Sequence, residues 1–199
     1  MLILALDLAK RTGFAIGRAG ETPRVGAKVL ASKEEPVEAG AQELGRFLRD
    51  AFVLEKPDMI VVEHWLHPKA NRSGDAVIWQ MLLHGAVHGV LGCYRDVRFE
   101  SPTPTEVRNH FCGRASAEAR SRAPSSWRAK KAARDATKAM VIDRAIALGY
   151  LPKTRRDDDI ADACALFDWV SVRVGRAPPR SLVLFGEAPL DDMTLGGTL

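Results

Sequence analysis

The chain has 199 residues, 46% of them apolar and 27% charged, as expected for one globular domain with a buried core. No apolar run reaches the roughly 20 residues of a membrane-spanning helix. The apolar start has no basic segment and is interrupted by Asp7, so we expect neither membrane association nor a signal peptide. Three widely spaced cysteines argue against a disulfide framework or zinc knuckle and are typical of reduced thiols in the cytoplasm.

The net charge of +4 is unevenly distributed along the chain. Residues 98–156 contain 14 Lys and Arg against 5 Asp and Glu, whereas the rest of the chain is acidic. A basic segment in an otherwise acidic chain is typical of a protein that binds a polyanion such as nucleic acid. The alternative is a basic loop that is merely solvated.

The first elements predicted along the chain are strands. Residues 2–8 form an apolar run broken only by Asp7, which indicates a buried strand. A turn at 10–13 and the apolar residues 14–17 predict a hairpin, and 25–30 predict a third strand. A carboxylate in a buried strand is unfavourable unless it is paired or binds a metal, so Asp7 needs a cation.

A helix is predicted over residues 35–54, where apolar side chains recur at helical spacing. After the break at Lys56-Pro57, residues 59–63 predict another buried strand, which also ends in a carboxylate, Glu63. Open α/β sheets build their sites at the carboxyl ends of their strands. Two buried strands that each end in an acid therefore indicate a functional site at those ends.

The second half of the chain is predicted to be largely helical. Residues 113–129 are rich in Gly, Ser, Pro and Arg, which favours an exposed basic loop. The tail 175–199 is expected to be loosely attached, which leaves 1–174 as the folded domain. The other predicted elements are helices at 76–92, 130–148 and 157–174, a strand ending at 98–100 and a short helix beginning near Thr103. This order predicts a mixed α/β layered domain.

The last predicted helix begins with the acidic run 157–159, followed by Asp162. Positions three apart share a helix face, so Asp159 and Asp162 are expected to lie side by side and repel each other. Acidic residues at a helix start can simply cap the helix and complement its dipole. The alternative is that the pair binds a cation, and the carboxylates of Asp7 and Glu63 favour this interpretation.

The order of Asp7, Glu63 and the D-x-x-D pair resembles the RuvC family of Holliday-junction resolvases, nucleases of the ribonuclease H-like superfamily. The resemblance covers residues 2–172 and rests on four pieces: Ile3–Asp7 with Thr12-Gly13, Ile60–Glu63, Lys138–Val141 and Asp159–Leu166. It implies a ribonuclease H-like three-layer α/β fold, with a mixed five-stranded sheet flanked by helices. It also implies a metal-dependent, structure-selective endodeoxyribonuclease of DNA recombination and repair that resolves four-way junctions as a homodimer.

The resemblance also implies the roles of the acidic residues. Asp7 would bridge two Mg²⁺ ions, for which Mn²⁺ can substitute. Glu63, Asp159 and Asp162 would supply the remaining protein ligands. The register favours Asp159 as the ligand, with Asp158 as the alternative.

Several further residues are candidates for catalysis and DNA binding. Lys138 occupies the place of the family's active-site lysine, where it would orient the attacking water or neutralise the scissile phosphate. A solvated helix lysine is the alternative. Trp65, close to Glu63, is a candidate for stacking on an opened base step, with loop packing as the alternative. The basic residues expected to contact phosphates are Lys69, Arg72, Arg128, Lys130, Lys131 and Arg134.

Helix 76–92 is apolar and contains small residues, which makes it the candidate dimer interface. His84 and His88 have the i, i+4 spacing of a zinc helix, but Gly85 stands where H-E-x-x-H has its glutamate. Core or polar-face histidines are therefore favoured over metal ligands. Trp79 is expected in the core or at the interface.

The chain departs from the family pattern in four places. Residues 8–11 replace a Pro-Gly-Ser type turn, and Leu66 stands where the family has an aromatic residue three positions past the glutamate. The basic segment is longer and the tail is additional. These departures favour a phage or prophage branch acting in a bacterial cell. The four acids indicate that a metal ion is bound but do not indicate which nucleic acid is cut. Flapped DNA, other branched DNA and RNA therefore stay alternative substrates. Two further alternatives are a non-catalytic junction-binding scaffold and, given the strand–Asp–turn–strand start, a phosphotransferase of the actin/sugar-kinase type.

Overall fold

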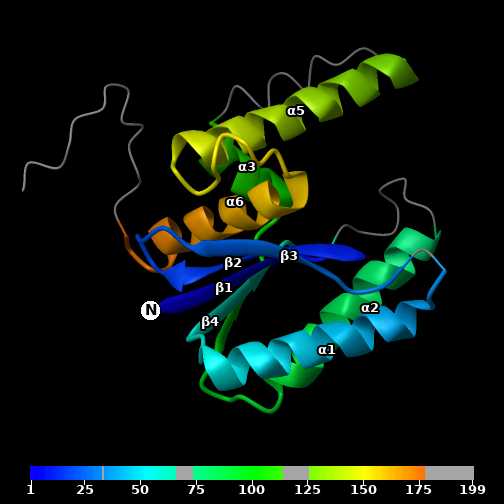
Figure 1. Ribbon diagram of the computed structural model, residues 1–199, viewed down its shortest axis with the longest axis vertical. Coiled ribbons are helices and arrows are strands. Elements are labelled where there is room, and N and C mark those ends of the chain that lie inside the picture. Colours follow the sequence, from blue (N-terminus) through cyan, green and yellow to red (C-terminus); the bar gives the residue numbers. More distant parts are fainter. Residues whose placement is uncertain (33, 66–73, 114–125, 178–199) are drawn as a thin grey trace, which may run out of the picture.

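The computed structural model describes residues 1–32, 34–65, 74–113 and 126–177. Its centre is a five-stranded sheet in the order β3-β2-β1-β4-β5 (Figure 1). The strands are β1 (Leu2–Asp7), β2 (Arg11–Arg18), β3 (Arg24–Val29), β4 (Met59–Val62) and β5 (Arg98–Glu100). The first three strands pair antiparallel, whereas β4 pairs in parallel with β1 and with β5. The predicted mixed five-stranded sheet is therefore confirmed.

Helices lie on both faces of the sheet (Figure 1). They are α1 (Val37–Leu54) and α2 (Gly74–Leu91) on one face, and α3 (Pro104–Cys112), α5 (Trp127–Ala147) and α6 (Asp158–Arg173) on the other. Side chains alternate along β1, so Leu4 and Leu6 join the core beneath α1 and α2, whereas Ile3 and Ala5 join the core beneath α6. The predicted three-layer architecture is confirmed. In the described ranges, no helix has the length and apolarity that crossing a membrane requires.

The second strand begins earlier than the sequence indicates. The prediction of a turn over 10–13 is wrong, because Arg11 to Gly13 already belong to β2 and Gly13 pairs with Asp7. The chain reverses just before Arg11, where the buried Thr12 hydroxyl donates to the Ala9 carbonyl at 2.8 Å. This hydroxyl also accepts from the Ala9 N–H, so a strand residue closes the turn.

Helix α6 is deeply buried, because it packs across β1 and β2 while α3 and α5 contact it from the other side. Asp157 is its N-cap, and the carboxylate accepts a hydrogen bond from the Ile160 N–H at 3.3 Å. The capping interpretation is therefore correct for Asp157. Capping does not account for Asp158 and Asp159, which form ion pairs with Lys138 and Arg11.

A polar network that no sequence pattern indicates holds α6 in place. Asp168 of α6 is buried, and its carboxylate accepts a hydrogen bond from the Tyr150 hydroxyl at 2.6 Å. The second oxygen lies 2.9 Å from Nε2 of His110 on α3. Tyr150 follows α5, so one carboxylate connects all three elements of this layer. Buried polar groups need such partners, and these fix the orientation of α6 on the sheet.

The basic segment is partly helical. Helix α5 begins at Trp127, with the Ser126 hydroxyl accepting from the Ala129 N–H, so the expected loop 113–129 ends earlier than predicted. Residues 114–125 and the tail from 178 lie outside the described residues. The expected start of α3 at Thr103 is confirmed by a capping box.

The start of the expected tail stays in contact with the domain. The Gly175 N–H donates to the Val170 carbonyl, and the Ala177 N–H donates to the Ser171 carbonyl. A Cβ on Gly175 would lie 2.7 Å from the Ala19 Cβ. Residues 175–177 therefore pack against the fold.

Candidate active site and metal centre

Three elements bring four carboxylates to one end of the sheet. Asp7 is the last residue of β1, and Glu63 directly follows β4, the parallel neighbour of β1. Asp159 and Asp162 lie at the start of α6, which packs across β1. The charges of Glu63, Asp159 and Asp162 all raise the pKa of Asp7. The structure thus places the four acids at one sheet end within electrostatic range of Asp7, whereas among the described residues only 157–159 form a group of three or more whose oxygens lie within 4.8 Å of one another.

A glycine allows α6 to begin directly against the sheet. Gly13 of β2 pairs with Asp7, and a Cβ added to it would lie 2.0 Å from the backbone oxygen of Asp159. Only a residue without a Cβ permits this approach of helix backbone to strand. Gly13 therefore positions the first turn of α6 beside the end of β1.

Two of the four acids, Asp7 and Asp162, have raised pKa values. Burial raises the pKa of Asp7 well above its usual value, and the neighbouring acids raise it further. Burial also raises the pKa of Asp162 to about 6, although the charges of Arg108 and Lys138 oppose this. Within the described part of the chain, neither carboxylate forms an ion pair. Crowded, uncompensated carboxylate oxygens are the donors that Mg²⁺ prefers, so these residues fit a divalent cation.

Asp162→Asn is expected to stabilise the metal-free protein at neutral pH. The folded-state pKa of about 6 lies above the ordinary 3.8, so the native state binds more protons between these values. The free energy of unfolding therefore falls as the pH rises from 3.8 to about 6. Above this range the charged carboxylate destabilises the fold to its full extent. The asparagine should raise the free energy of unfolding at pH 7 by on the order of 1–2 kcal/mol.

Thermal unfolding in chelator measures this effect, and the gain should shrink at pH 4.5, where the native carboxyl is already protonated. An asparagine variant that is less stable than wild type at pH 7 would contradict the conclusion that the ionised carboxylate of Asp162 destabilises the metal-free fold.

The acidic run at the start of α6 is partly neutralised. Residues 157–159 each place a carboxylate oxygen within 4.8 Å of the others. Asp158 forms an ion pair with Lys138, which lowers the pKa of Asp158 and raises that of Lys138. Asp158 and Asp159 are thus both engaged by a positive side chain, since Arg11 pairs with Asp159, and of the two it is Asp159 that raises the pKa of Asp7.

Lys138 lies beside the acids through its ion pair with Asp158, and its side chain is 48% exposed, as the alternative of a solvated helix lysine also expects. Sequence reasoning missed two arginines nearby. Arg11 of β2 forms ion pairs with two carboxylates of the acidic run. Arg108 of α3 lowers the pKa of both Asp7 and Asp162 through its positive charge. No local pattern indicates either arginine, since their partners lie on other elements.

A cavity of about 370 Å³ lies beside Glu63. Its walls include Trp65, Met81, His84, His88, Phe99 and Ser101. Burial lowers the pKa of His84 to about 4, and the ring is hydrogen-bonded to the backbone of Glu63. His84 is thus a core histidine that supports Glu63, as the sequence favoured, and no potential metal-ligand group among the described residues contains it. Trp65 is half-buried at this cavity, close to the acids.

The basic residues expected to bind DNA are placed only in part. The N-terminal half of α5 extends away from the rest of the domain (Figure 1). It carries four of these residues, all exposed: Arg128, Lys130, Lys131 and Arg134. Lys131 forms an ion pair with Asp135 at 2.9 Å. Trp127, beside them, is 74% exposed and was not anticipated. Lys69 and Arg72 lie outside the described residues.

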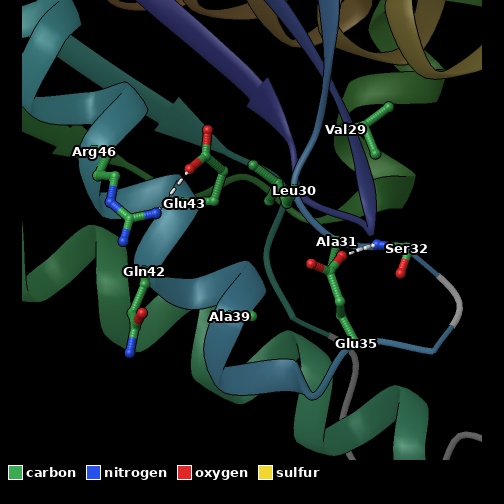
Figure 2. A pocket seen from close by; sticks show the side chains of 9 residues that line it. All are labelled: Val29, Leu30, Ala31, Ser32, Glu35, Ala39, Gln42, Glu43 and Arg46. Atoms are coloured by element: carbon green, nitrogen blue, oxygen red, sulfur yellow. Dashed lines mark hydrogen bonds and ion pairs between the residues drawn. The ribbon is translucent and has the colours of Figure 1, made fainter.

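A second cavity, of about 360 Å³, lies between the end of β3 and α1 (Figure 2). Its charged side chains already have partners. Glu43 pairs with Arg46, and Glu35 accepts from the Ser32 N–H, as the dashed lines show (Figure 2). This cavity faces α1, on the layer opposite α6, and shows no feature of an active site.

A mixed five-stranded sheet, with carboxylates ending β1 and β4 and opening a helix packed across them, defines a ribonuclease H-like fold. Two structures of Thermus thermophilus RuvC share it at 17% identity, with TM-scores of 0.56 and, in complex with a Holliday junction substrate, 0.58. Both alignments cover 90% of this chain and 100% of the other.

The yeast mitochondrial Holliday junction resolvase Ydc2 is 14% identical, with a TM-score of 0.48 over 85% of this chain and 77% of that one. No protein-family model matches this sequence, and no curated protein sequence is similar to it. The similarity to RuvC establishes the fold, so function has to be argued from the site.

Proposed function

We propose that this protein is a metal-dependent, structure-selective endonuclease that resolves four-way DNA junctions, a crossover junction endodeoxyribonuclease. The convergence of Asp7, Glu63, Asp159 and Asp162 on one sheet end carries this proposal. Hydrolysis of a phosphodiester requires charge stabilisation at an already anionic phosphorus, which carboxylate-bound divalent cations provide. A RuvC structure of the same fold holds a Holliday junction substrate, which supports the choice of substrate.

Each acid has a proposed role. Asp7, at the centre of the cluster, would bridge two Mg²⁺ ions, with Mn²⁺ able to substitute. Glu63, Asp159 and Asp162 would supply the remaining protein ligands. When bound, the ions would supply an activated water and stabilise the leaving oxygen.

The positive side chains around the acids act on the phosphate and the water. Lys138 is held beside the acids by Asp158, where its ammonium would orient the attacking water or neutralise the scissile phosphate. Arg108 contributes a further positive charge from α3. Trp65, at the cavity beside Glu63, is proposed to stack on a base at the opened junction.

Incision assays test the proposal. A labelled four-way junction, a nicked duplex, a flap and an RNA/DNA hybrid are incubated with Mg²⁺ or with chelator. We expect paired symmetric nicks on the junction that chelator abolishes. Preferential cutting of the flap or the hybrid would reassign the substrate, and junction binding without any cutting would favour a scaffold. ATP hydrolysis would revive the phosphotransferase alternative.

The basic end of α5 is proposed to hold DNA by its phosphates, together with Lys69 and Arg72. The double variant Arg128→Gln/Lys130→Gln should weaken junction binding about tenfold at moderate salt and reduce the slope of log K against log salt by about 2. Fluorescence anisotropy across a salt series measures both quantities. The matched control is Arg46→Gln/Arg49→Gln on α1, where both arginines are exposed on the opposite layer. An unchanged slope would remove α5 from the DNA interface.

A homodimer is proposed because paired incision of a two-fold symmetric junction needs two sites related by a dyad. Helix α2 exposes the apolar side chains Ile78, Met81 and Leu82, which supports it as the interface. Trp79 packs instead toward α1, where its ring would lie 2.5 Å from a Cβ on Gly40. Analytical ultracentrifugation of Met81→Asp tests the interface, and an unchanged dimer would place it elsewhere.

The setting of the protein is also a proposal. Cys93, Cys112 and Cys164 form no disulfide among the described residues, which supports a reducing cytoplasm. We propose a bacterial protein of phage or prophage origin, with a nuclease domain over 1–174 and a tail over 175–199, of which the first residues, 175–177, pack against the domain. Limited proteolysis would test this boundary through the mass of the resistant fragment.

A further inference from the structure

Arg11 joins the start of β2 to the start of α6. Its Nη1 donates to Oδ1 of Asp157 at 2.9 Å, and its Nη2 contacts Oδ2 of the same carboxylate. Nη1 also donates to Oδ2 of Asp159. The planar guanidinium therefore engages Asp157 with both of its terminal nitrogens and holds Asp159 at the same time, a geometry that lysine cannot reproduce.

This contact divides the proposed metal ligands into two kinds. Asp159 has an arginine as counter-ion. Asp7 and Asp162 form no ion pair within the described residues; burial raises the pKa of both carboxyl groups, and repulsion by neighbouring acids raises it further. A cation that binds Asp7 and Asp162 relieves this repulsion. A cation that uses Asp159 has to compete with a guanidinium that is charged at every accessible pH.

We propose that Arg11 is a positioning residue that occupies Asp159 in the metal-free protein and is displaced when a divalent cation binds there. This inference rests on the metal site of the proposed function. The Arg11 side chain is 41% exposed, so it can swing into solvent without disturbing the core. The two cation sites are consequently unequal: the first ion binds Asp7 and Asp162 readily, and the second binds weakly while Arg11 remains.

Asp157 provides the decisive variant. Asp157→Asn weakens the hold on Arg11 but keeps an N-cap side chain, because asparagine caps helices as well as aspartate does. Loss of a nearby negative charge would by itself lower cation affinity. A gain in affinity in this variant can therefore come only from the weakened arginine contact, whereas Arg11→Gln also gains from removal of a positive charge.

Isothermal titration calorimetry with Mn²⁺, without DNA, measures both binding steps. We expect the second step to tighten roughly fivefold in Arg11→Gln and roughly threefold in Asp157→Asn, the scale of a partly exposed ion pair. Arg24→Gln is the matched control, since Arg24 pairs with Glu55 at 2.6 Å on another part of the sheet, and it should bind as wild type. The Arg11 Nε–Hε NMR signal, identified by its loss in Arg11→Gln, should shift during a Mg²⁺ titration.

The outcomes separate this inference from the proposed function. The inference would be wrong if the second Mn²⁺ ion bound wild type and Asp157→Asn with equal affinity and the Arg11 NMR signal did not shift. Arg11 would then serve only to hold α6 against β2. Absence of Mn²⁺ binding in every variant, the control included, would overturn the metal site itself. If Arg11→Gln fails to fold, Asp157→Asn and the NMR titration still decide.

Discussion

Asparagine in place of Asp7 is expected to abolish cation-dependent incision while leaving junction binding within about twofold of wild type. The amide preserves the size of the side chain but carries no charge, so it is a poor ligand between two cations. Asp7 is the acid on which the other three proposed ligands all act. We therefore expect the rate of incision to fall by about 10³-fold or more.

Single-turnover incision of a labelled junction in Mg²⁺ measures the rate, and anisotropy in chelator measures binding. Asp50→Asn is the control, because Asp50 is an exposed carboxylate of α1 that pairs with Arg49. A normal rate for Asp7→Asn would remove Asp7 from the chemistry. If binding were lost together with the rate, the defect would lie in DNA contact or folding.

The order of the elements and the place of the site could be predicted because both depend on local signals. The apolar runs of β1 and β4 are readable from sequence alone, and each ends at an acid. Since parallel neighbours end at one sheet edge, the topology itself brings Asp7 and Glu63 together. The acids of α6 join them because the helix packs across β1.

The partners of these acids could not be predicted, because they are distant in the chain. Arg11 and Asp157 are separated by 146 residues. The sequence shows both charges but gives no reason to pair them, and Arg11 stood out only as part of an unusual turn. Arg108 and the network around Asp168 were missed for the same reason: each depends on how α3 and α6 pack.

The start of β2 could not be predicted either, because it also depends on a contact with a distant part of the chain. Glycine after a run of polar residues is a turn signal, and this pattern predicts a turn over 10–13. In the fold, Gly13 lies within a strand, because the backbone of α6 approaches too closely for a Cβ. The close packing of α6 against β2 requires a glycine at position 13, and in the sequence this glycine resembles a turn residue.

Alanine at position 13 is expected to impair divalent-cation binding and stability together. Its Cβ would lie 2.0 Å from the carbonyl oxygen and 2.4 Å from the carbonyl carbon of Asp159. These are backbone atoms that cannot rotate away, so the first turn of α6 must shift. That shift carries Asp159 and Asp162 away from Asp7 and adds an overpacking cost of about 1–3 kcal/mol.

Calorimetric titration with Mn²⁺ and thermal unfolding measure the two effects of Gly13→Ala separately. The control is Gly45→Ala in α1, where no atom lies within 4 Å of the added Cβ, and the helix should gain about 0.5–1 kcal/mol. A folded Gly13→Ala protein with weakened cation binding would show that the position of α6, and not global stability, sets the affinity. Wild-type affinity in a destabilised Gly13→Ala protein would instead mean that the cation ligands do not depend on the first turn of α6. Asp7 and Glu63, at the ends of β1 and β4, would then have to hold the cation without it.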